Sequence, residues 1–164
     1  MNGYDIIDEA VVDAPAGVVW DALVAEFRGA ARWWVPYNTF SSTSGTPDGA
    51  GGEVRVTVHT KGVGNGGLKL RFTSRTESVD PGRRLAVEYV DGVFRGPSEF
   101  VLEPVDEGRR TRIAMHFRGR PHGWLKLLAR VADIGAEHSR ATLAAFVALE
   151  AYLAKDRVAG GSPR

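Results

Sequence analysis

The sequence predicts an α+β fold in which one antiparallel sheet packs against a long C-terminal helix. Three observations support this prediction. Apolar and polar residues alternate along consecutive segments between residues 53 and 118, as expected of antiparallel strands with one buried face. Short turn sequences such as Asp80-Pro-Gly and Asp91-Gly separate these segments, so neighbouring strands must run antiparallel. Over residues 124–153 the apolar residues recur at helical spacing, which indicates a helix.

The composition of the 164 residues is that of one soluble globular domain. No apolar run is long enough for a membrane span. The 21 Lys and Arg nearly balance the 20 Asp and Glu, so net charge gives no reason to expect nucleic acid or an anionic membrane as a partner. The chain has no cysteine, which excludes disulfides and thiol chemistry. We expect a cytoplasmic bacterial protein that uses no metal and no cofactor.

The first part of the chain predicts a strand followed by two short helices. Residues 4–12 are rich in β-branched side chains and form the strand. Apolar residues recur at helical spacing over 15–27, a range that begins with a proline suited to the first helical turn. Residues 30–35 predict a second short helix that ends before the next proline. A polar, glycine-rich loop follows at 41–52.

Five alternating segments then predict the strands of the sheet. They span residues 53–60, 68–79, 84–90, 94–105 and 110–118. The glycine-rich residues 62–67 form a longer hairpin tip. Neither glycine-rich stretch contains a phosphate-binding motif.

The C-terminal segment predicts a helix with one inward stripe. The stripe consists of Trp124, Leu128, Val131, Gly135, His138, Thr142, Phe146, Leu149 and Leu153. Gly135 either kinks this helix or separates a short helix from a long one. We expect a single domain over 1–157 and a flexible tail over 158–164. Because a twisted sheet cannot close evenly on a helix, a cavity of a few hundred Å³ is expected between them.

Four segments carry a resemblance to a known superfamily: EAVVDAPAGVVWDAL (9–23), RWWVP (32–36), GGEVRVTV (51–58) and RTRIAMHF (110–117). They resemble the START-like (SRPBCC) superfamily, the helix-grip fold of polyketide cyclases and dehydrases, Bet v 1-like proteins and lipid-transfer domains. The resemblance covers about residues 4–155. It implies a curved seven-stranded sheet wrapped around the C-terminal helix. One strand is then hidden near Tyr37–Ser44, and the concave face and helix stripe line a ligand pocket.

Aromatic, apolar and small polar residues on these faces are the candidate ligand contacts. They are Trp33, Trp34, Tyr37, Phe72, Tyr89, Arg95, Ser98, Phe100, Met115, Phe117, Leu128, Gly135, His138 and Thr142. The two adjacent tryptophans are either a pocket wall or one core residue and one surface cover. Phe40 could continue that wall. Gly96-Pro97 suggests a bulge that would turn Arg95 or Glu99 into the cavity.

His138 is the best candidate for a catalytic group, because a histidine can act as a general acid or base near neutral pH. The alternative is a histidine bonded to a strand or exposed at the helix edge. His59 and His116 fall among arginines and glutamates on the opposite, solvated face of their strands. No histidine or carboxylate spacing matches a metal site.

Three functions are consistent with this sequence. The first is binding of a small hydrophobic molecule, such as a lipid, an aromatic compound or a polyketide. The second is a polyketide cyclase, aromatase or dehydratase acting in the same cavity, mainly through proximity. The third is a protein-interaction module, which predicts an exposed apolar patch instead of a deep pocket. A homodimer is compatible with each of them.

Overall fold

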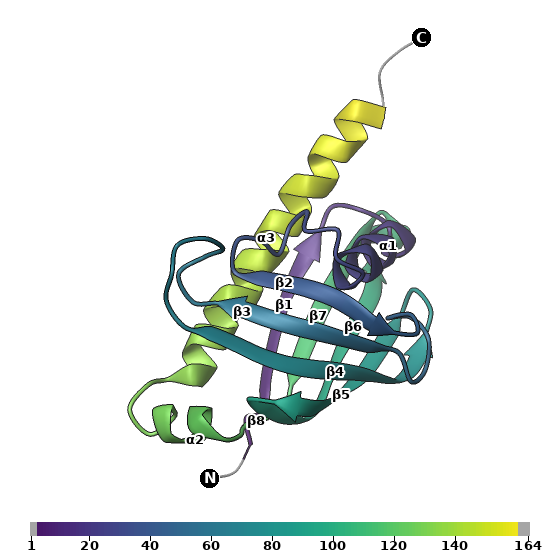
Figure 1. Ribbon diagram of the computed structural model, residues 1–164. Coiled ribbons are helices and arrows are strands. Elements are labelled where there is room, and N and C mark those ends of the chain that lie inside the picture. The colour runs from purple at the N-terminus through teal and green to yellow at the C-terminus, as the bar shows by residue number, and fades with distance from the viewer. Residues whose placement is uncertain (1–2, 161–164) are drawn as a thin grey trace.

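The computed structural model describes residues 3–160 as a curved sheet that holds a long helix (Figure 1). The helices and strands follow one another as β1 (Ile6–Val12), α1 (Ala16–Phe27), β2 (Asn38–Ser44), β3 (Glu53–His59), β4 (Lys69–Asp80), β5 (Arg84–Gly92), β6 (Phe94–Val105), a 3-10 turn (Asp106–Gly108), β7 (Arg110–Phe117), β8 (Arg120–Pro121), α2 (Trp124–Leu128) and α3 (Ile134–Gly160). The α+β class and the five strands predicted from alternation are confirmed.

The strands form one antiparallel sheet in the order β1-β7-β6-β5-β4-β3-β2. The short strand β8, which the sequence did not predict, pairs with β6 beside this path. The strand implied by the resemblance near Tyr37–Ser44 is β2, at the edge of the sheet. Most of its residues are exposed, so it lacks the alternation that marks a half-buried strand.

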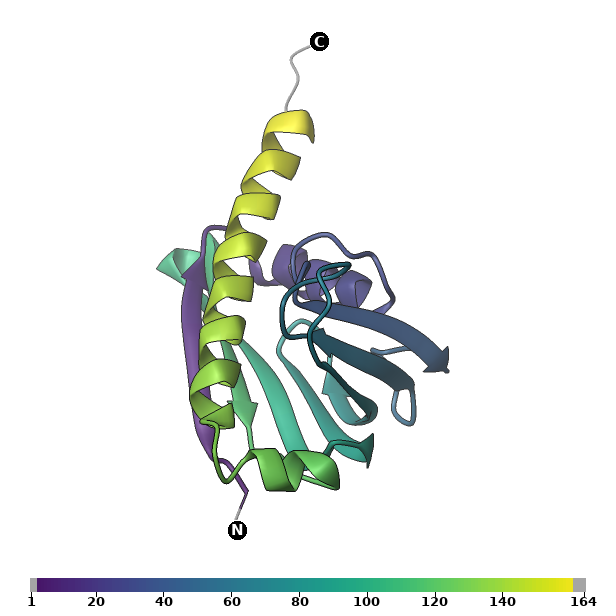
Figure 2. The same cartoon turned by 60° about the vertical axis from the view of Figure 1, so that its left-hand side comes forward.

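The sheet curves so strongly that its two edges lie on opposite sides of an interior space. Figure 2 shows α3 along β1 at one side, β2 and β3 at the other, and α1 across one end. Side chains from the concave face, α1 and α3 meet in a single buried core. This is the arrangement of a sheet wrapped around the C-terminal helix that the resemblance implied.

The second short helix predicted over residues 30–35 is wrong. The backbone N–H groups of Arg32, Trp33 and Trp34 donate to the carboxylate of Glu26, at 2.9, 3.1 and 2.7 Å. Ala31 has a φ of 51°, which a right-handed helix does not allow. Because the Glu26 side chain supplies the acceptors, this segment folds as a loop that is tied to the end of α1.

The C-terminal segment is a short helix followed by a long one, which was one of the two predicted alternatives. The break lies at residues 129–133, before Gly135. Trp124 and Val131 are 48% and 85% exposed, so the expected inward stripe begins only in α3. A Cβ at Gly135 would lie 3.1 Å from Ile6 Cδ1 and 3.2 Å from Tyr4 Cε1. The missing side chain therefore lets α3 lie close to β1.

The predicted tail over 158–164 is wrong for residues 158–160, because α3 continues through them. Residues 161–164 of that tail lie outside the described part of the chain. Within residues 3–160, no helix combines the length and the apolar character needed to cross a membrane.

Candidate functional site

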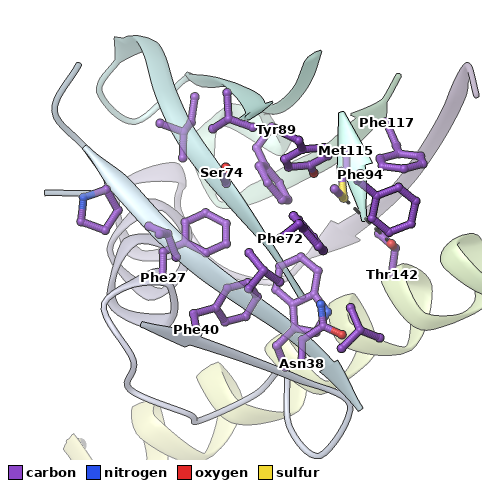
Figure 3. Close-up of a pocket in the computed structure, with 18 of the residues that line it drawn as sticks. Phe27, Asn38, Phe40, Phe72, Ser74, Tyr89, Phe94, Met115, Phe117 and Thr142 are labelled. Atoms are coloured by element: carbon purple, nitrogen blue, oxygen red, sulfur yellow. Dashed lines mark hydrogen bonds between the residues drawn. The ribbon is translucent and has the colours of Figure 1, made fainter. Parts of the chain in front are cut away.

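A cavity lies between the concave face of the sheet, α1 and α3 (Figure 3). Its volume is about 80 Å³, well below the expected few hundred Å³. Large aromatic side chains fill much of the space, and the cavity is partly open to solvent. The lining residues are Phe27, Trp34, Asn38, Phe40, Pro47, Val54, Val56, Val58, Phe72, Ser74, Thr76, Leu85, Val87, Tyr89, Phe94, Phe100, Met115, Phe117, His138 and Thr142.

One group of aromatic rings lies at the α1 end of the cavity. Phe27 lies 5.4 Å from Phe100 and 5.1 Å from Phe40, measured between ring centroids. Trp34 contacts Phe40 edge-on at 5.3 Å. Edge-on contacts of this kind are favourable beyond the area that they bury. The buried Glu26 carboxylate holds the backbone of Trp34, so this wall is positioned by a polar anchor outside the cavity.

A second aromatic group lies deeper along the sheet. Phe72 contacts Tyr89 at 4.9 Å and Phe94 at 5.3 Å. Phe94 contacts Phe117 edge-on at 5.5 Å. These side chains come from β4, β5, β6 and β7, and they point inward because residues two apart on a strand share one face.

The imidazole of His138 closes this second group from the α3 side. It stacks on Phe117, with ring centroids 4.0 Å apart and an angle of 17° between the planes. Its Nδ1 atom is enclosed and has no hydrogen-bond partner among the described residues. Burial lowers the pKa of His138 to about 4, because an apolar surrounding disfavours the charged imidazolium. The ring is therefore neutral at pH 7.

Few other polar groups reach the cavity. Thr142 is buried and donates to the sulfur of Met115 at 3.9 Å. Thr76 is already satisfied, because it donates to the carbonyl of Pro47 at 2.8 Å. Burial raises the pKa of Tyr89 to about 12. None of the lining residues is an Asp, Glu, Lys or Arg, so the wall carries no formal charge at neutral pH.

Eight of the predicted contact residues line the cavity, and the other six do not. Those that line it are Trp34, Phe72, Tyr89, Phe100, Met115, Phe117, His138 and Thr142. Whether they bind a ligand stays a prediction. The six outside it are Trp33, Tyr37, Arg95, Ser98, Leu128 and Gly135.

Each of these six has another place in the structure. Trp33 is buried behind Trp34 and stacks on it at 5.0 Å, so neither tryptophan is a surface cover. Tyr37 is 47% exposed. Ser98 donates to the carbonyl of His116 at 3.0 Å. Leu128 packs against the edge of the core, and Gly135 contacts β1 as described above.

The suggested bulge at Gly96-Pro97 is absent from the pairing of β6 with β5, whose register is continuous from Gly96 to Val101. Residues facing inward alternate through this region, so Arg95 and Glu99 lie on the outer face. Arg95 donates to the carbonyl of Gly92 at 2.6 Å. Glu99 forms an ion pair with Arg84 at 2.5 Å.

The other two histidines considered in the sequence also lie away from the cavity. His116 shares a hydrogen bond with the carboxylate of Asp5, and His59 shares one with the hydroxyl of Thr39 at 2.9 Å. Desolvation and the nearby Lys69 and Arg71 lower the pKa of His59. Among the described residues, no group of three or more His, Asp or Glu side chains is placed to hold a metal ion.

Several lining residues were not among the candidates. Val54, Val56 and Val58 alternate along β3 and face inward, as do Leu85 and Val87 on β5. The alternation of apolar and polar residues along these strands was the sequence pattern that could have identified them as lining residues. Phe27 belongs to the helical apolar spacing of α1, which was its signal, whereas the inward position of Asn38 on an exposed edge strand carried no comparable signal.

Comparison with known proteins identifies one family and many related folds. The family described as "Polyketide cyclase / dehydrase and lipid transport" matches residues 6–149. No curated protein sequence matches this chain. A crystal structure of the Zhui aromatase/cyclase from Streptomyces sp. R1128 is similar with a TM-score of 0.71 and 23% identity, covering 98% of this chain and 99% of that one.

Two further solved structures share this fold. The protein TTHA0849 from Thermus thermophilus has a TM-score of 0.71 and 18% identity, with 97% of this chain and 100% of that chain covered. A START superfamily protein from Mycobacterium smegmatis has a TM-score of 0.67 and 15% identity, with coverage of 93% and 99%. Similarity at these identities establishes the fold alone.

Proposed function

The chain belongs to the polyketide cyclase / dehydrase and lipid transport family, and we propose that it binds a small, uncharged hydrophobic molecule between the sheet and α3. Membership in this family confirms the predicted START-like superfamily. The observation that carries the proposal is an aromatic cavity without a single charged side chain in its wall. Cavities of this kind bind apolar molecules, and a few polar groups orient them.

The chemistry of the wall restricts the charge of the ligand. Burying an ion without a partner of opposite charge is strongly unfavourable. His138 is neutral at pH 7, because burial lowers its pKa to about 4, so it cannot neutralise a carboxylate. A phenol, ketone or alcohol therefore suits the cavity, whereas its carboxylate analogue does not.

The polar group of the ligand belongs beside His138. A neutral imidazole has one N–H donor and one acceptor nitrogen, and the Nδ1 atom of His138 has no partner among the described residues. Leaving such an atom unpaired costs about 1–3 kcal/mol. A hydroxyl or carbonyl group of the ligand that bonds to the imidazole offsets this cost.

The volume of the cavity restricts the size of the ligand. At about 80 Å³, it is smaller than an engineered cavity of roughly 150 Å³ that binds benzene. A ligand of two or more rings therefore extends into the solvent-open side or displaces aromatic side chains. We expect Phe72 and Phe40 to move, because both lie at the cavity wall.

Calorimetric titration with 2-naphthol and 2-naphthoate tests this proposal, since the two probes have similar shapes and differ in charge. We expect saturable binding of 2-naphthol and at least tenfold weaker binding of 2-naphthoate at neutral pH. Failure of both probes, or tighter binding of the anion, would overturn the proposal.

Two neighbouring substitutions on α3 provide the matched control. Thr142→Phe fills the cavity from a position that is 2% exposed, whereas Leu143 is 41% exposed and outside the lining. We expect Thr142→Phe to abolish naphthol binding and Leu143→Phe to preserve it. Equal binding by both variants would mean that the probe binds elsewhere.

A cyclase activity in the same cavity is the second candidate. Two titratable groups, His138 and Tyr89, lie next to Phe117, with ring centroids 4.0 and 6.0 Å from it. In a cyclisation, Tyr89 would donate a hydrogen bond to an enolate oxygen, and neutral His138 would accept a proton. Equal turnover of a poly-β-ketone substrate by the wild type and His138→Gln would exclude this role.

A further inference from the structure

The short helix α2 and the turn that follows it present apolar side chains to solvent. Trp124, Leu127 and Val131 are 48%, 64% and 85% exposed. Trp124 and Leu127 are three residues apart and lie on one side of α2, and Val131 lies in the turn after α2. Leu125 is fully buried and anchors the helix to the core, so the outward direction of the other three is imposed by the fold. Figure 1 shows α2 beside β8, at the end of the molecule away from the C-terminus.

Basic side chains surround this apolar face. A hollow beside Trp124 is lined by Lys69, Arg71 and His122, with the buried Val93 in its floor. Lys126 and Arg130 lie between the apolar positions along α2 and its C-terminal end. We call these residues, with Leu127 and Val131, the α2 surface.

The cations of the α2 surface make no ion pair with any residue of 3–160, whereas many arginines elsewhere do. Arg84, Arg112 and Arg140 pair with Glu99, Glu103 and Glu137. The nearby acids Asp91 and Asp133 accept backbone N–H groups of Gly92 and Ala136, and both keep their negative charge. Because the four Lys and Arg residues of the α2 surface outnumber these two acids, the α2 surface has a local positive charge, although the whole chain is close to neutral.

We propose that the α2 surface docks on the surface of an anionic lipid bilayer. Tryptophan is favoured at the membrane interface, where its ring contacts acyl chains and its N–H stays near polar headgroups. Leu127 and Val131 add apolar area beside it. Lys69, Arg71, Lys126 and Arg130 attract the lipid phosphates. Because the contacting helix is short, binding is shallow and reversible.

The α2 surface adjoins the cavity through the start of β6. Val93 lines the hollow, and the next residue, Phe94, lines the cavity and pairs with Pro121 of β8. Docking therefore places one end of the cavity near the bilayer. The proposed docking does not depend on a ligand in the cavity, because its contacts lie on the outer surface.

Co-sedimentation with lipid vesicles tests the docking. Vesicles of phosphatidylcholine containing phosphatidylglycerol should bind the protein, and pure phosphatidylcholine should bind it at least tenfold more weakly. Added salt should weaken the binding. Equal binding to both kinds of vesicle, or binding to neither, would overturn the proposal.

Paired variants locate the binding on the surface. Trp124→Ala with Leu127→Ala, and separately Lys126→Glu with Arg130→Glu, should each weaken vesicle binding about tenfold or more. Val147→Ala and Lys155→Glu on exposed positions of α3 are the controls and should bind as the wild type does. Unchanged binding by both α2 double variants would refute the docking.

Two measurements distinguish membrane docking from ligand binding in the cavity and from dimerisation. The cavity-filling variant Thr142→Phe should keep vesicle binding, so a failed ligand test leaves the docking testable on its own. The mass of the protein in solution should be that of a monomer for the wild type. A dimer that Leu127→Ala dissociates, combined with no vesicle binding, would show that a second copy covers the α2 surface instead.

Discussion

The imidazole of His138 lies flat on the ring of Phe117, with centroids 4.0 Å apart and planes at 17°. A histidine in this position is held by an aromatic face and by burial, and not by a carboxylate. Its environment therefore favours the neutral form. The burial of His138 determines the expected pH dependence of the stability of this protein.

Protonation of His138 should destabilise the fold in mild acid. Its pKa is about 4 in the folded state and near 6.5 when unfolded. Between these values the unfolded chain binds more protons, so the free energy of unfolding falls as the pH is lowered from about 6.5 to 4. The contribution of this group is roughly 3 kcal/mol.

Urea unfolding at several pH values checks this expectation. His138→Phe keeps an aromatic ring on Phe117 and should show a flatter pH dependence over this range, whereas His122→Phe at an exposed position should resemble the wild type. Identical pH profiles for the wild type and His138→Phe would contradict the assignment. An NMR titration of the His138 ring gives its pKa directly.

Replacing the buried Glu26 should be costly, although its side chain forms no ion pair within residues 3–160. Its carboxylate accepts three backbone N–H groups, from Arg32, Trp33 and Trp34. In Glu26→Gln one oxygen becomes an NH₂ group that faces these donors, and we expect a loss of about 3 kcal/mol. The exposed Glu150→Gln is the control. Denaturation midpoints that agree for both variants would argue against this role.

Two glycines with similar backbone conformations should respond differently to a methyl group. Gly92 and Gly108 have φ of 87° and 84°. A Cβ at Gly92 would lie 2.1 Å from the carbonyl oxygen of Arg71, but a Cβ at Gly108 meets nothing within 4 Å. We expect Gly92→Ala to cost more than about 3 kcal/mol, since backbone must shift.

Gly108→Ala should cost only about 1 kcal/mol, the strain of a left-handed conformation. Thermal unfolding of the two variants gives the comparison. A larger loss for Gly108→Ala would show that backbone strain, and not the close approach of β4 at Gly92, limits these positions.

Shortening Phe72 should enlarge the range of ligands. Its ring lines the cavity wall and contacts the rings of Tyr89 and Phe94. Phe72→Leu should cost about 1–2 kcal/mol in stability and improve binding of a three-ring phenol relative to 2-naphthol. Leu102→Val, at a buried position outside the cavity lining, should lose stability without changing the ratio of the two binding constants. Parallel titrations with the three-ring phenol and 2-naphthol measure this ratio.

Sequence predictions were correct where neighbouring residues along the chain determine the structure, and wrong where a contact between separate elements determines it. β3 and β6 were located correctly because the alternation of their own residues marks a buried and an exposed face. The helix over 30–35 was wrong because a carboxylate from α1 supplies its hydrogen-bond acceptors. Gly96-Pro97 suggested a bulge, yet β6 keeps its register there and its first residues pair with β8.

The sequence by itself determined the positions of β1, α1 and β3–β7, the apolar face of each of the five strands β3–β7, and the position of His138 and Thr142 on one side of α3. These features follow from residue composition and periodicity, which neighbouring residues along the chain create. Only the tertiary structure decided the volume of the cavity, the burial of His138 against Phe117 and the outward direction of Trp124. Each of these depends on how side chains from separate elements pack against one another, and the periodicity of the sequence does not specify that packing.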